Sequence, residues 1–503
     1  MADGYLAIDL GTSAVKANVV DEQGRILGRG SAEHPMLQPR PGFAEQHPND
    51  WWHATVLAVK QATAEAGEPH LRAIGLTGQM HGTVLLGNDG PLAPAIIWTD
   101  TRSGNEVQEI TARIGARHLI ETTGSPIATG FQAATIRWLQ RHEPAILRQT
   151  RQILLPKDYL RWKLTGNYAT DPSDASGTLL FDVRARNWSE EMLATLDVDR
   201  SLLPPVLPSS AVTGELNAGA AKQLQLPSGI PVIAGGGDAP CAALGAGIVN
   251  PGALLLTIST GAQVFLPTTK PGVDPEGRIH TFCAALEPGP NQPGWYQMGA
   301  TMVAGLAMRW LRDVVFELPH KSGYEQMTAA ASEVPPGASG LVFLPYLTGE
   351  RTPHMDPNAR GVLLGLTASH RRGHLVRAVM EGVAFALLDA FDVVRQFGAM
   401  PAQAVLAGGG ARSVLWQQII ADLFGLPVVP LESADQSAVG AAMLAATGME
   451  HVELLDVARS WSHYGAPIEP RADVHAHYEQ LRPIFRQAYV KHREDFRLLT
   501  NMG

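Results

Sequence analysis

The stretch YLAIDLGTSAVKANVV, residues 5–20, is the part of the sequence that decides the fold. An apolar run leads into the small polar turn GTS at residues 11–13, and a second apolar run follows it. Two apolar runs joined by a short polar turn predict a β-hairpin. The segment RILGR at residues 25–29 predicts a third strand beside it.

A second copy of this pattern lies far downstream. Residues 253–266 read ALLLTISTGAQVFL, which is again an apolar run, a small hydroxyl-and-glycine turn and an apolar run. The two copies predict a duplicated architecture, and a chain of 503 residues exceeds the roughly 250–300 residues of one ordinary core. The turn sequence VNPG at residues 249–252 places the boundary, giving domains 1–249 and 250–503.

Between and after the two hairpins, strand and helix patterns alternate. Strands are predicted at residues 72–77, 95–98, 231–234 and 404–407, and apolar residues with a helical rhythm predict a helix at 377–397. Such alternation is typical of α/β domains.

Composition excludes several classes of protein. Hydrophobic residues make up 45% of the chain, as in globular proteins, and the net charge of −9 argues against a nucleic-acid-binding surface. The two cysteines form neither a zinc motif nor a disulfide framework. With no signal-peptide pattern and no apolar run of roughly 20 residues, we expect a cytoplasmic protein without a membrane partner.

Glycine-rich turns are the candidates for phosphate binding. The sequence has no P-loop motif, and Pro240 and Ser413 interrupt the two possible dinucleotide fingerprints. The turn after Asp9 remains, where backbone amides and two hydroxyls are positioned to contact phosphate oxygens. Asp9 is a candidate ligand of hydrated Mg²⁺, and Lys16 adds a positive charge nearby. An ordinary hairpin turn with a polar tip is the alternative.

The segment Gly-Gly-Gly-Asp at residues 235–238 offers a second site. The glycines leave room for a substrate beside Asp238, whose carboxylate suits a general base. The alternative role for Asp238 is the N-cap of a helix that starts near Pro240.

Polar residues after two predicted strands are candidates for substrate contacts. Met80 and His81 follow the strand at 72–77, at the end of a strand where α/β proteins often bind ligands. The alternative for His81 is a partly buried ring that hydrogen-bonds to backbone. Asp100 and Arg102 either reach a substrate or form a local surface ion pair.

Four segments in a fixed order resemble the FGGY family of carbohydrate kinases over nearly the whole chain. Residues 9–13 resemble its first phosphate loop and residues 259–262 its second, although the usual Gly-Thr-Ser-Gly is replaced by Ser-Thr-Gly-Ala. Residues 408–413 resemble its adenosine-side glycine turn, and residues 361–381 fit its C-terminal signature.

The resemblance implies two actin/Hsp70-like (ribonuclease H-like) ATPase domains of α/β class with a catalytic cleft between them. The N-terminal domain is expected to hold the sugar, the first phosphate loop and the catalytic Asp238, and the C-terminal domain the second phosphate loop and the adenosine turn. ATP and Mg²⁺ are the implied cofactors, with Asp9 catalytic, holding the metal largely through water, and Asp238 a second possible ligand. The implied ATP-binding residues are Gly11, Thr12, Ser13, Lys16, Thr260, Gly261, Gly408, Gly409, Gly410 and Ser413.

Within the family, the segment Gln-Met-His-Gly at residues 79–82 resembles the branch that phosphorylates D-xylulose, as do residues 98–102, 155–160 and 344–354. The expected activity is therefore transfer of phosphate from ATP to D-xylulose, giving the 5-phosphate. The implied sugar-binding residues are Gln79, Met80, His81, Asp100, Arg102 and Asp238. L-xylulose, ribulose, D-arabinitol and gluconate remain alternative substrates, and a non-catalytic sugar sensor or an actin-like ATPase is the alternative of another class. Family members are often homodimers, so a homodimer is expected.

Overall fold

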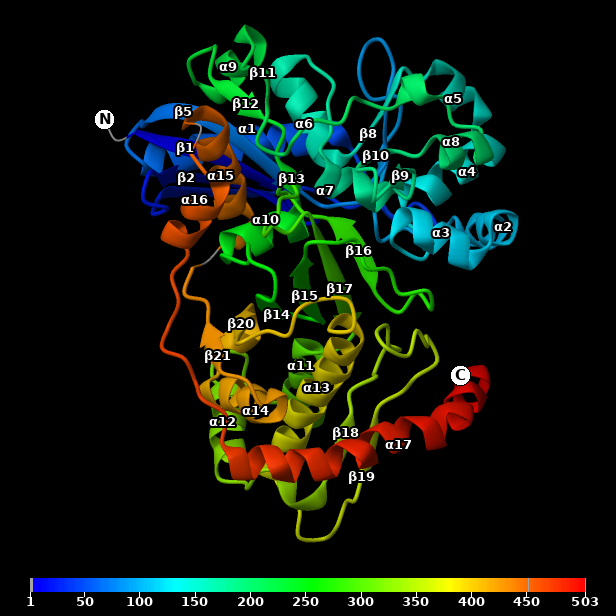
Figure 1. Ribbon diagram of the computed structural model, residues 1–503, viewed down its shortest axis with the longest axis vertical. Helices are drawn as coiled ribbons and strands as arrows, with labels where there is room; N and C mark the ends of the chain where they lie inside the picture. Colours follow the sequence, from blue (N-terminus) through cyan, green and yellow to red (C-terminus); the bar gives the residue numbers. More distant parts are fainter. Residues whose placement is uncertain (1–2, 434, 451, 503) are drawn as a thin grey trace. The chain divides into compact units, whose positions relative to one another are not determined.

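The computed structural model describes residues 3–433, 435–450 and 452–502 (Figure 1). The chain forms two compact units. The first comprises Met1–Asn250, Thr268–Tyr296 and Ser433–His463, and the second comprises Pro251–Pro267, Gln297–Glu432 and Tyr464–Gly503. Mixed sheets and helices occur throughout, which confirms the α/β class predicted from the alternating pattern.

The first unit contains a seven-stranded sheet of order β11-β12-β5-β1-β2-β3, with β13 pairing with β5. Strands β1 and β2 are antiparallel, which confirms the predicted hairpin, whereas β1 and β5 run parallel. The carboxyl ends of β1 and β5 therefore meet at one edge of the sheet. The strands are β1 (Asp3–Leu10), β2 (Ala14–Asp21), β3 (Ile26–Glu33), β5 (His70–Gly78), β11 (Val212–Glu215), β12 (Pro231–Ile233) and β13 (Gly236–Gly237).

Two helices pack closely against this sheet. Helix α1 (Pro48–Glu65) lies on β2 and β3, and helix α15 (Gln436–Glu450) lies on β1 and β5 (Figure 1). Glycines allow the second contact: a Cβ atom at Gly75 of β5 would lie 2.1 Å from the carbonyl oxygen of Ala441. Helix α10 (Asp238–Gly245), which begins at the expected base, packs on the same α15.

A second sheet has six strands in the order β16-β17-β15-β14-β20-β21. Its strands β14 and β15 are antiparallel, as the second hairpin pattern predicted, and β14 runs parallel to β20. The strands are β14 (Leu254–Ile258), β15 (Ala262–Thr268), β16 (His280–Cys283), β17 (Trp295–Thr301), β20 (Ala404–Ala407) and β21 (Val428–Pro430). The long helices of the second unit are α13 (Arg372–Val394), α14 (Val414–Phe424) and α17 (Ala472–Met502).

The remaining elements are short or peripheral. The helices are α2 (Gly104–Ile114), α3 (Ala116–Thr123), α4 (Gln132–His142), α5 (Pro144–Gln149), α6 (Pro156–Thr165), α7 (Pro172–Ala175), α8 (Glu190–Thr195), α9 (Ala218–Leu224), α11 (Gly305–Trp310), α12 (Gly323–Ser332) and α16 (Leu454–Trp461). The strands are β4 (Glu45–Gln46), β6 (Val84–Leu86), β7 (Ala95–Ile96), β8 (Gln152–Leu154), β9 (Phe181–Asp182), β10 (Asn187–Trp188), β18 (Val342–Leu344) and β19 (Val362–Leu364). Among the residues described above, none of the helices is both long and apolar enough to cross a bilayer.

We predict that Gly440→Ala destabilises the protein, because the new Cβ would lie 1.9 Å from the carbonyl oxygen of Cys241 in α10. Overpacking of this kind costs about 1–3 kcal/mol in the free energy of unfolding, which chemical denaturation measures. The matched control is Gly104→Ala at the start of α2, where no heavy atom lies within 4 Å of the new Cβ. Equal stability of the two variants would contradict the proposed contact.

Candidate active site

The strand register of the first sheet brings the two expected catalytic carboxylates to one edge. Asp9 on β1 lies opposite Thr77 on β5, and Thr77 lies opposite Gly236 on β13. Asp238 follows directly as the first residue of α10. Asp9 and Asp238 therefore sit near the carboxyl ends of two strands, β1 and β13, that both pair with β5.

Asp238 is not the N-cap of α10, so this alternative to the catalytic role is wrong. The N-cap residue is Gly237, and Asp238 stands inside the first turn of the helix. Its Oδ1 accepts a hydrogen bond from the amide of Ala239 at 2.7 Å. The three preceding glycines form the turn that lets the carboxylate project from the strand end.

The two carboxylates share a site that disfavours their charged forms. Burial and, to a lesser extent, the neighbouring charge of Asp9 together raise the pKa of Asp238 to about 7. Burial also raises the pKa of Asp9 to about 6, although Lys16 opposes this effect. Asp9 Oδ1 is buried and has no hydrogen-bond partner among the residues that the structure describes. Two adjacent carboxylates with an unsatisfied oxygen are suited to a cation or to proton transfer.

Lys16 is held by a partner that the sequence did not reveal. Its Nζ lies 2.9 Å from Asp435 Oδ1, and Arg29 also approaches Asp435, at 3.6 Å. Lys16 remains half exposed. The predicted contact with phosphate would therefore be made by a Lys16 side chain that is already paired with Asp435.

The expected first phosphate loop follows Asp9 and is closed by Gly11, whose amide donates to the carbonyl of Ala14 at 3.0 Å. The hydroxyl of Thr12 accepts a hydrogen bond from Trp98 Nε1 at 2.9 Å. Ser13 is exposed at the tip of the turn. The loop is therefore a tight polar turn fixed from its flanks.

Gln79 lies behind this loop. It is buried, and its Nε2 donates to Gln46 Oε1 at 2.9 Å. Gln46 in turn donates to the carbonyl of Thr12 at 2.7 Å. Gln79 thus connects the end of β5, through Gln46, to the expected first phosphate loop.

Met80 and His81 follow β5, as predicted, and Met80 lies beside the residue before Asp238. A Cβ atom at Gly237 would come within 2.9 Å of the Met80 side chain, so Met80 packs against the residue before Asp238. His81 has a backbone φ of 72°, which is uncommon for a non-glycine residue and typical of functional sites.

The ring of His81 is fixed in one orientation. Its Nδ1 lies 2.7 Å from the carbonyl oxygen of Gly177, and the ring lies 4.1 Å from that of Phe131. Because a carbonyl only accepts hydrogen bonds, Nδ1 carries a proton and donates it to this hydrogen bond. His81 therefore makes the backbone hydrogen bond that the alternative interpretation expected, and it also follows β5 at the position predicted for a sugar contact.

Asp100 and Arg102 form a buried ion pair rather than the surface pair considered as an alternative. Arg102 Nε lies 2.9 Å from Asp100 Oδ2, and Arg102 Nη2 lies 2.6 Å from Glu45. The guanidinium also covers the ring of Phe43, 3.7 Å from its centroid. Their predicted contact with sugar is left to experiment.

In the second unit, strand register brings the other two expected loops together. Thr257 of β14 lies opposite Ala407 of β20, so the turn after each strand emerges at the same edge. Gly408 has a φ of 85°, and its Cβ would lie 2.4 Å from the carbonyl oxygen of Ile258. Only glycine permits this approach of the adenosine turn to the second phosphate loop.

The remaining residues of the two turns differ in their surroundings. Thr260 is exposed, and a Cβ at Gly261 would lie 2.5 Å from the carbonyl of Thr301. Gly409 is exposed with open space beside it, whereas Gly410 is buried against Ile258. Ser413 caps helix α14, accepting a hydrogen bond from the amide of Trp416 at 3.3 Å.

Two residues beside the second phosphate loop were missed by the sequence reasoning. The exposed Arg309 donates to Thr260 Oγ1 at 3.1 Å. The buried Glu350 accepts from the amides of Met302 and Arg351 at 2.8 and 2.7 Å, and burial raises its pKa to about 8. Arg309 lies in helix α11, 49 residues after Thr260, so no local pattern relates the two residues.

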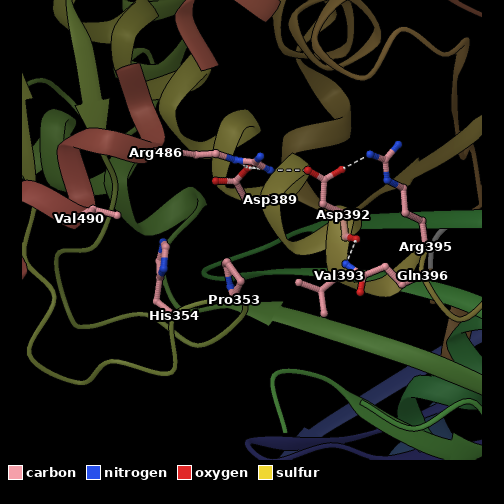
Figure 2. A pocket seen from close by; sticks show the side chains of 9 residues that line it. All are labelled: Pro353, His354, Asp389, Asp392, Val393, Arg395, Gln396, Arg486 and Val490. Atoms are coloured by element: carbon pink, nitrogen blue, oxygen red, sulfur yellow. Dashed lines mark hydrogen bonds and ion pairs between the residues drawn. The ribbon is translucent and has the colours of Figure 1, made fainter. Parts of the chain in front are cut away.

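Figure 2 shows a surface pocket of about 510 Å³ in the second unit that contains none of the predicted site residues. Its charged side chains pair with one another: Arg486 donates to Asp389 at 2.7 Å, and Arg395 lies 2.8 Å from Asp392. The lining therefore carries little unmatched charge and does not define a ligand.

Comparison with known proteins agrees with this geometry. Residues 4–245 match the model of the N-terminal domain of the FGGY family of carbohydrate kinases, and residues 254–449 match that of the C-terminal domain. The chain belongs to the FGGY family of carbohydrate kinases.

This FGGY kinase is 39% identical over 492 residues to the xylulose kinase of Escherichia coli K12, with 96% of this chain and 98% of the relative covered. It is 35% identical to the xylulose kinase of Bacillus subtilis 168, with 97% of each chain covered. The crystal structure of xylulose kinase from Rhodospirillum rubrum superposes with a TM-score of 0.90 at 31% identity, covering 98% of this chain and 99% of the other.

The raised pKa of Asp238 predicts how stability depends on pH. The unfolded chain releases this proton near the ordinary value of 3.8 and the folded protein only near 7, so stability falls as the pH rises through this range. We expect Asp238→Asn to be about 1–3 kcal/mol more stable than the wild type at pH 8, with the difference disappearing toward pH 4.

Denaturant unfolding between pH 4 and 8 measures this difference. Asp274→Asn is the control of opposite sign, because hydrogen bonds from Arg278 outweigh burial and lower the pKa of Asp274. That variant should be less stable than the wild type at pH 8. If Asp238→Asn were less stable than the wild type at pH 8, folding would not disfavour the ionised form of Asp238.

Proposed function

We propose that this chain phosphorylates D-xylulose from ATP to give D-xylulose 5-phosphate. The main observation behind this proposal is that Asp238, with its pKa raised to about 7, lies beside Asp9 and Met80 in a member of the FGGY family. Identity of 39% with a xylulose kinase over almost the full length of both chains supports this sugar. Kinases of this family use ATP as the phosphoryl donor.

In the proposed reaction, Asp238 accepts the proton of the sugar hydroxyl while the oxygen of that hydroxyl attacks the γ-phosphorus of ATP. A bond forms between this oxygen and phosphorus, the bond to the bridging oxygen breaks, and ADP leaves. A pKa near neutrality suits a base that must both accept and release a proton. His81, held by Gly177, would orient the sugar through contacts of its ring.

Mg²⁺ fits the residues present at this site. Asp9 Oδ1 is buried with no hydrogen-bond partner in the described part of the chain, and Asp238 adds a second carboxylate at the same sheet edge. Mg²⁺ commonly takes one or two carboxylates together with water and phosphate oxygens. When bound, the ion would neutralise charge on the phosphates, and Asp9 would hold it largely through water.

We assign the sugar, the first phosphate loop and the base to residues 1–249, and the remaining ATP contacts to residues 250–503. Thr260, Gly261 and the glycine turn at 408–410 would contact ATP from the second unit, since the register places them at one edge of its sheet. The cytoplasmic location, expected from the sequence, and the homodimer, implied by the resemblance, stay predictions.

The substrate is tested by measuring ADP release by the purified protein with Mg·ATP and a panel of sugars. D-xylulose should give the highest kcat/KM, above L-xylulose, ribulose, D-arabinitol and gluconate, because these differ at single hydroxyl or carboxyl positions that a polar site distinguishes strongly. Preference for another member of the panel would refute the sugar assignment, and no turnover with any of them would refute the kinase.

The base is tested with Asp238→Asn. We expect kcat to fall by about 10²–10⁴-fold, because the amide cannot accept the proton, whereas the KM for ATP should change little. Asp274→Asn, a buried aspartate outside the site, should keep wild-type turnover and serves as the control. Near-normal turnover in Asp238→Asn would exclude Asp238 as the base.

The role of Asp9 is tested with Asp9→Asn over a range of Mg²⁺ concentrations. Loss of one carboxylate charge should raise the Mg²⁺ concentration needed for half-maximal turnover by about tenfold or more, because the ion loses an ionised ligand partner. An unchanged Mg²⁺ requirement would separate Asp9 from the metal.

A further inference from the structure

A cluster of five charged side chains lies completely buried beneath the expected base. Lys157 Nζ lies 2.6 Å from Asp158, 3.0 Å from Asp171 and 3.3 Å from Asp174. Arg161 lies 2.7 Å from Asp158. All five side chains are at most 1% exposed, so each charge depends on its partners inside the cluster.

The cluster contains three carboxyl groups and two cations. Burial raises the pKa of Asp174 well above its ordinary value, which favours the neutral form of this carboxyl beside the other two. The ion pairs restrain the cluster, because movement of one member would leave another charge unpaired in a low-dielectric interior.

The cluster is bonded to the glycine turn that carries Asp238. Arg161 Nη1 donates to the carbonyl of Ala234 at 2.7 Å. The hydroxyl of Ser173 donates to Asp171 Oδ2 at 2.5 Å and accepts from the amide of Gly237 at 3.2 Å. A hydroxyl has one proton, so its donation to Asp171 turns the oxygen lone pairs toward Gly237.

The space around Ser173 shows that this contact constrains the turn. A Cβ atom at Gly236 would lie 2.9 Å from Ser173 Oγ. Ser173 also lies in α7, and the short helical turn that follows α7 contains Gly177, whose carbonyl holds His81. One segment, residues 171–177, thus supports both the peptide before the base and the histidine expected to contact the sugar.

We propose that Ser173, oriented by Asp171, is a positioning residue that fixes the Gly237 peptide and thereby the direction of the Asp238 carboxylate. This inference rests on the proposed function for its effect on catalysis. Ser173 itself touches neither substrate; it acts through the peptide bond that precedes the base. A displacement of the carboxylate by about 1 Å is enough to lower the rate of proton transfer strongly.

The test compares Ser173→Ala with Ser209→Ala. Both serines donate to the same oxygen, Asp171 Oδ2, but Ser173 is the one bonded to Gly237. Ser173→Ala should lower kcat for D-xylulose by about tenfold to a hundredfold, with the KM of both substrates within about twofold of the wild type. Ser209→Ala should keep kcat within about twofold, since it leaves the Gly237 contact intact.

Amide hydrogen exchange provides a readout that does not depend on turnover. Exchange at the Gly237 amide should be about tenfold faster in Ser173→Ala than in the wild type and unchanged in Ser209→Ala. Should the alanine variant not fold, Ser173→Cys replaces it, with the same changes expected on a smaller scale because a thiol is a weak acceptor.

The outcomes separate this inference from the proposed function. An inactive wild type refutes the proposed function, and the exchange rates then decide whether Ser173 fixes the peptide. Equal effects of the two serine substitutions on kcat and exchange, or an unchanged kcat in Ser173→Ala, would overturn the positioning role. A rise in KM with unchanged kcat would also overturn it.

Discussion

The parallel pairing of β1 with β5 is the constraint on which the candidate site depends. It aligns Asp9 with Thr77, and the pairing of β13 with the same strand aligns Thr77 with Gly236. Two carboxylates are thereby brought together at a strand edge without a matching pair of cations, which is unfavourable in itself and is reflected in the raised pKa values of both. The buried Lys157 cluster supplies the rigidity that such an arrangement requires.

The second unit repeats the same plan with different chemistry. Its β14–β15 hairpin corresponds to β1–β2, and the parallel strand β20 takes the place of β5. Here the strand ends carry glycine and threonine in place of aspartate, and the nearby charge is the cation Arg309. One framework thus presents acids in the first unit and groups suited to phosphate in the second.

Features encoded within a few residues could be predicted from the sequence. Both hairpins and the strand entering Gly408 follow from local patterns, and the two strand ends that carry Asp9 and Met80 follow from the same alternation. The pairing of Lys16 with Asp435 could not be predicted, because 419 residues separate the partners and no local pattern relates them. Lys157 entered the sequence analysis only within residues 155–160, and Ser173 carried no signal, whereas tertiary packing buries both side chains completely.

Local rules also misjudged details at the site. An aspartate before a helix is commonly a cap, yet Gly237 takes that position and leaves Asp238 in the first turn. Asp100 and Arg102 suggested a solvated pair, whereas Glu45 and the ring of Phe43 enclose them. In each case the deciding partner comes from a distant segment.

Helix α15, which covers β1 and β5, has a consequence for the order in which the protein is made. The sheet emerges from the ribosome within the first 240 residues, but the helix that closes its face follows some 200 residues later. During synthesis the face around Gly75 stays uncovered while the second unit is translated. The first unit is therefore the first to begin folding and among the last parts to finish. A nascent chain of this kind depends on protection of an apolar surface until its C-terminal half has been synthesised.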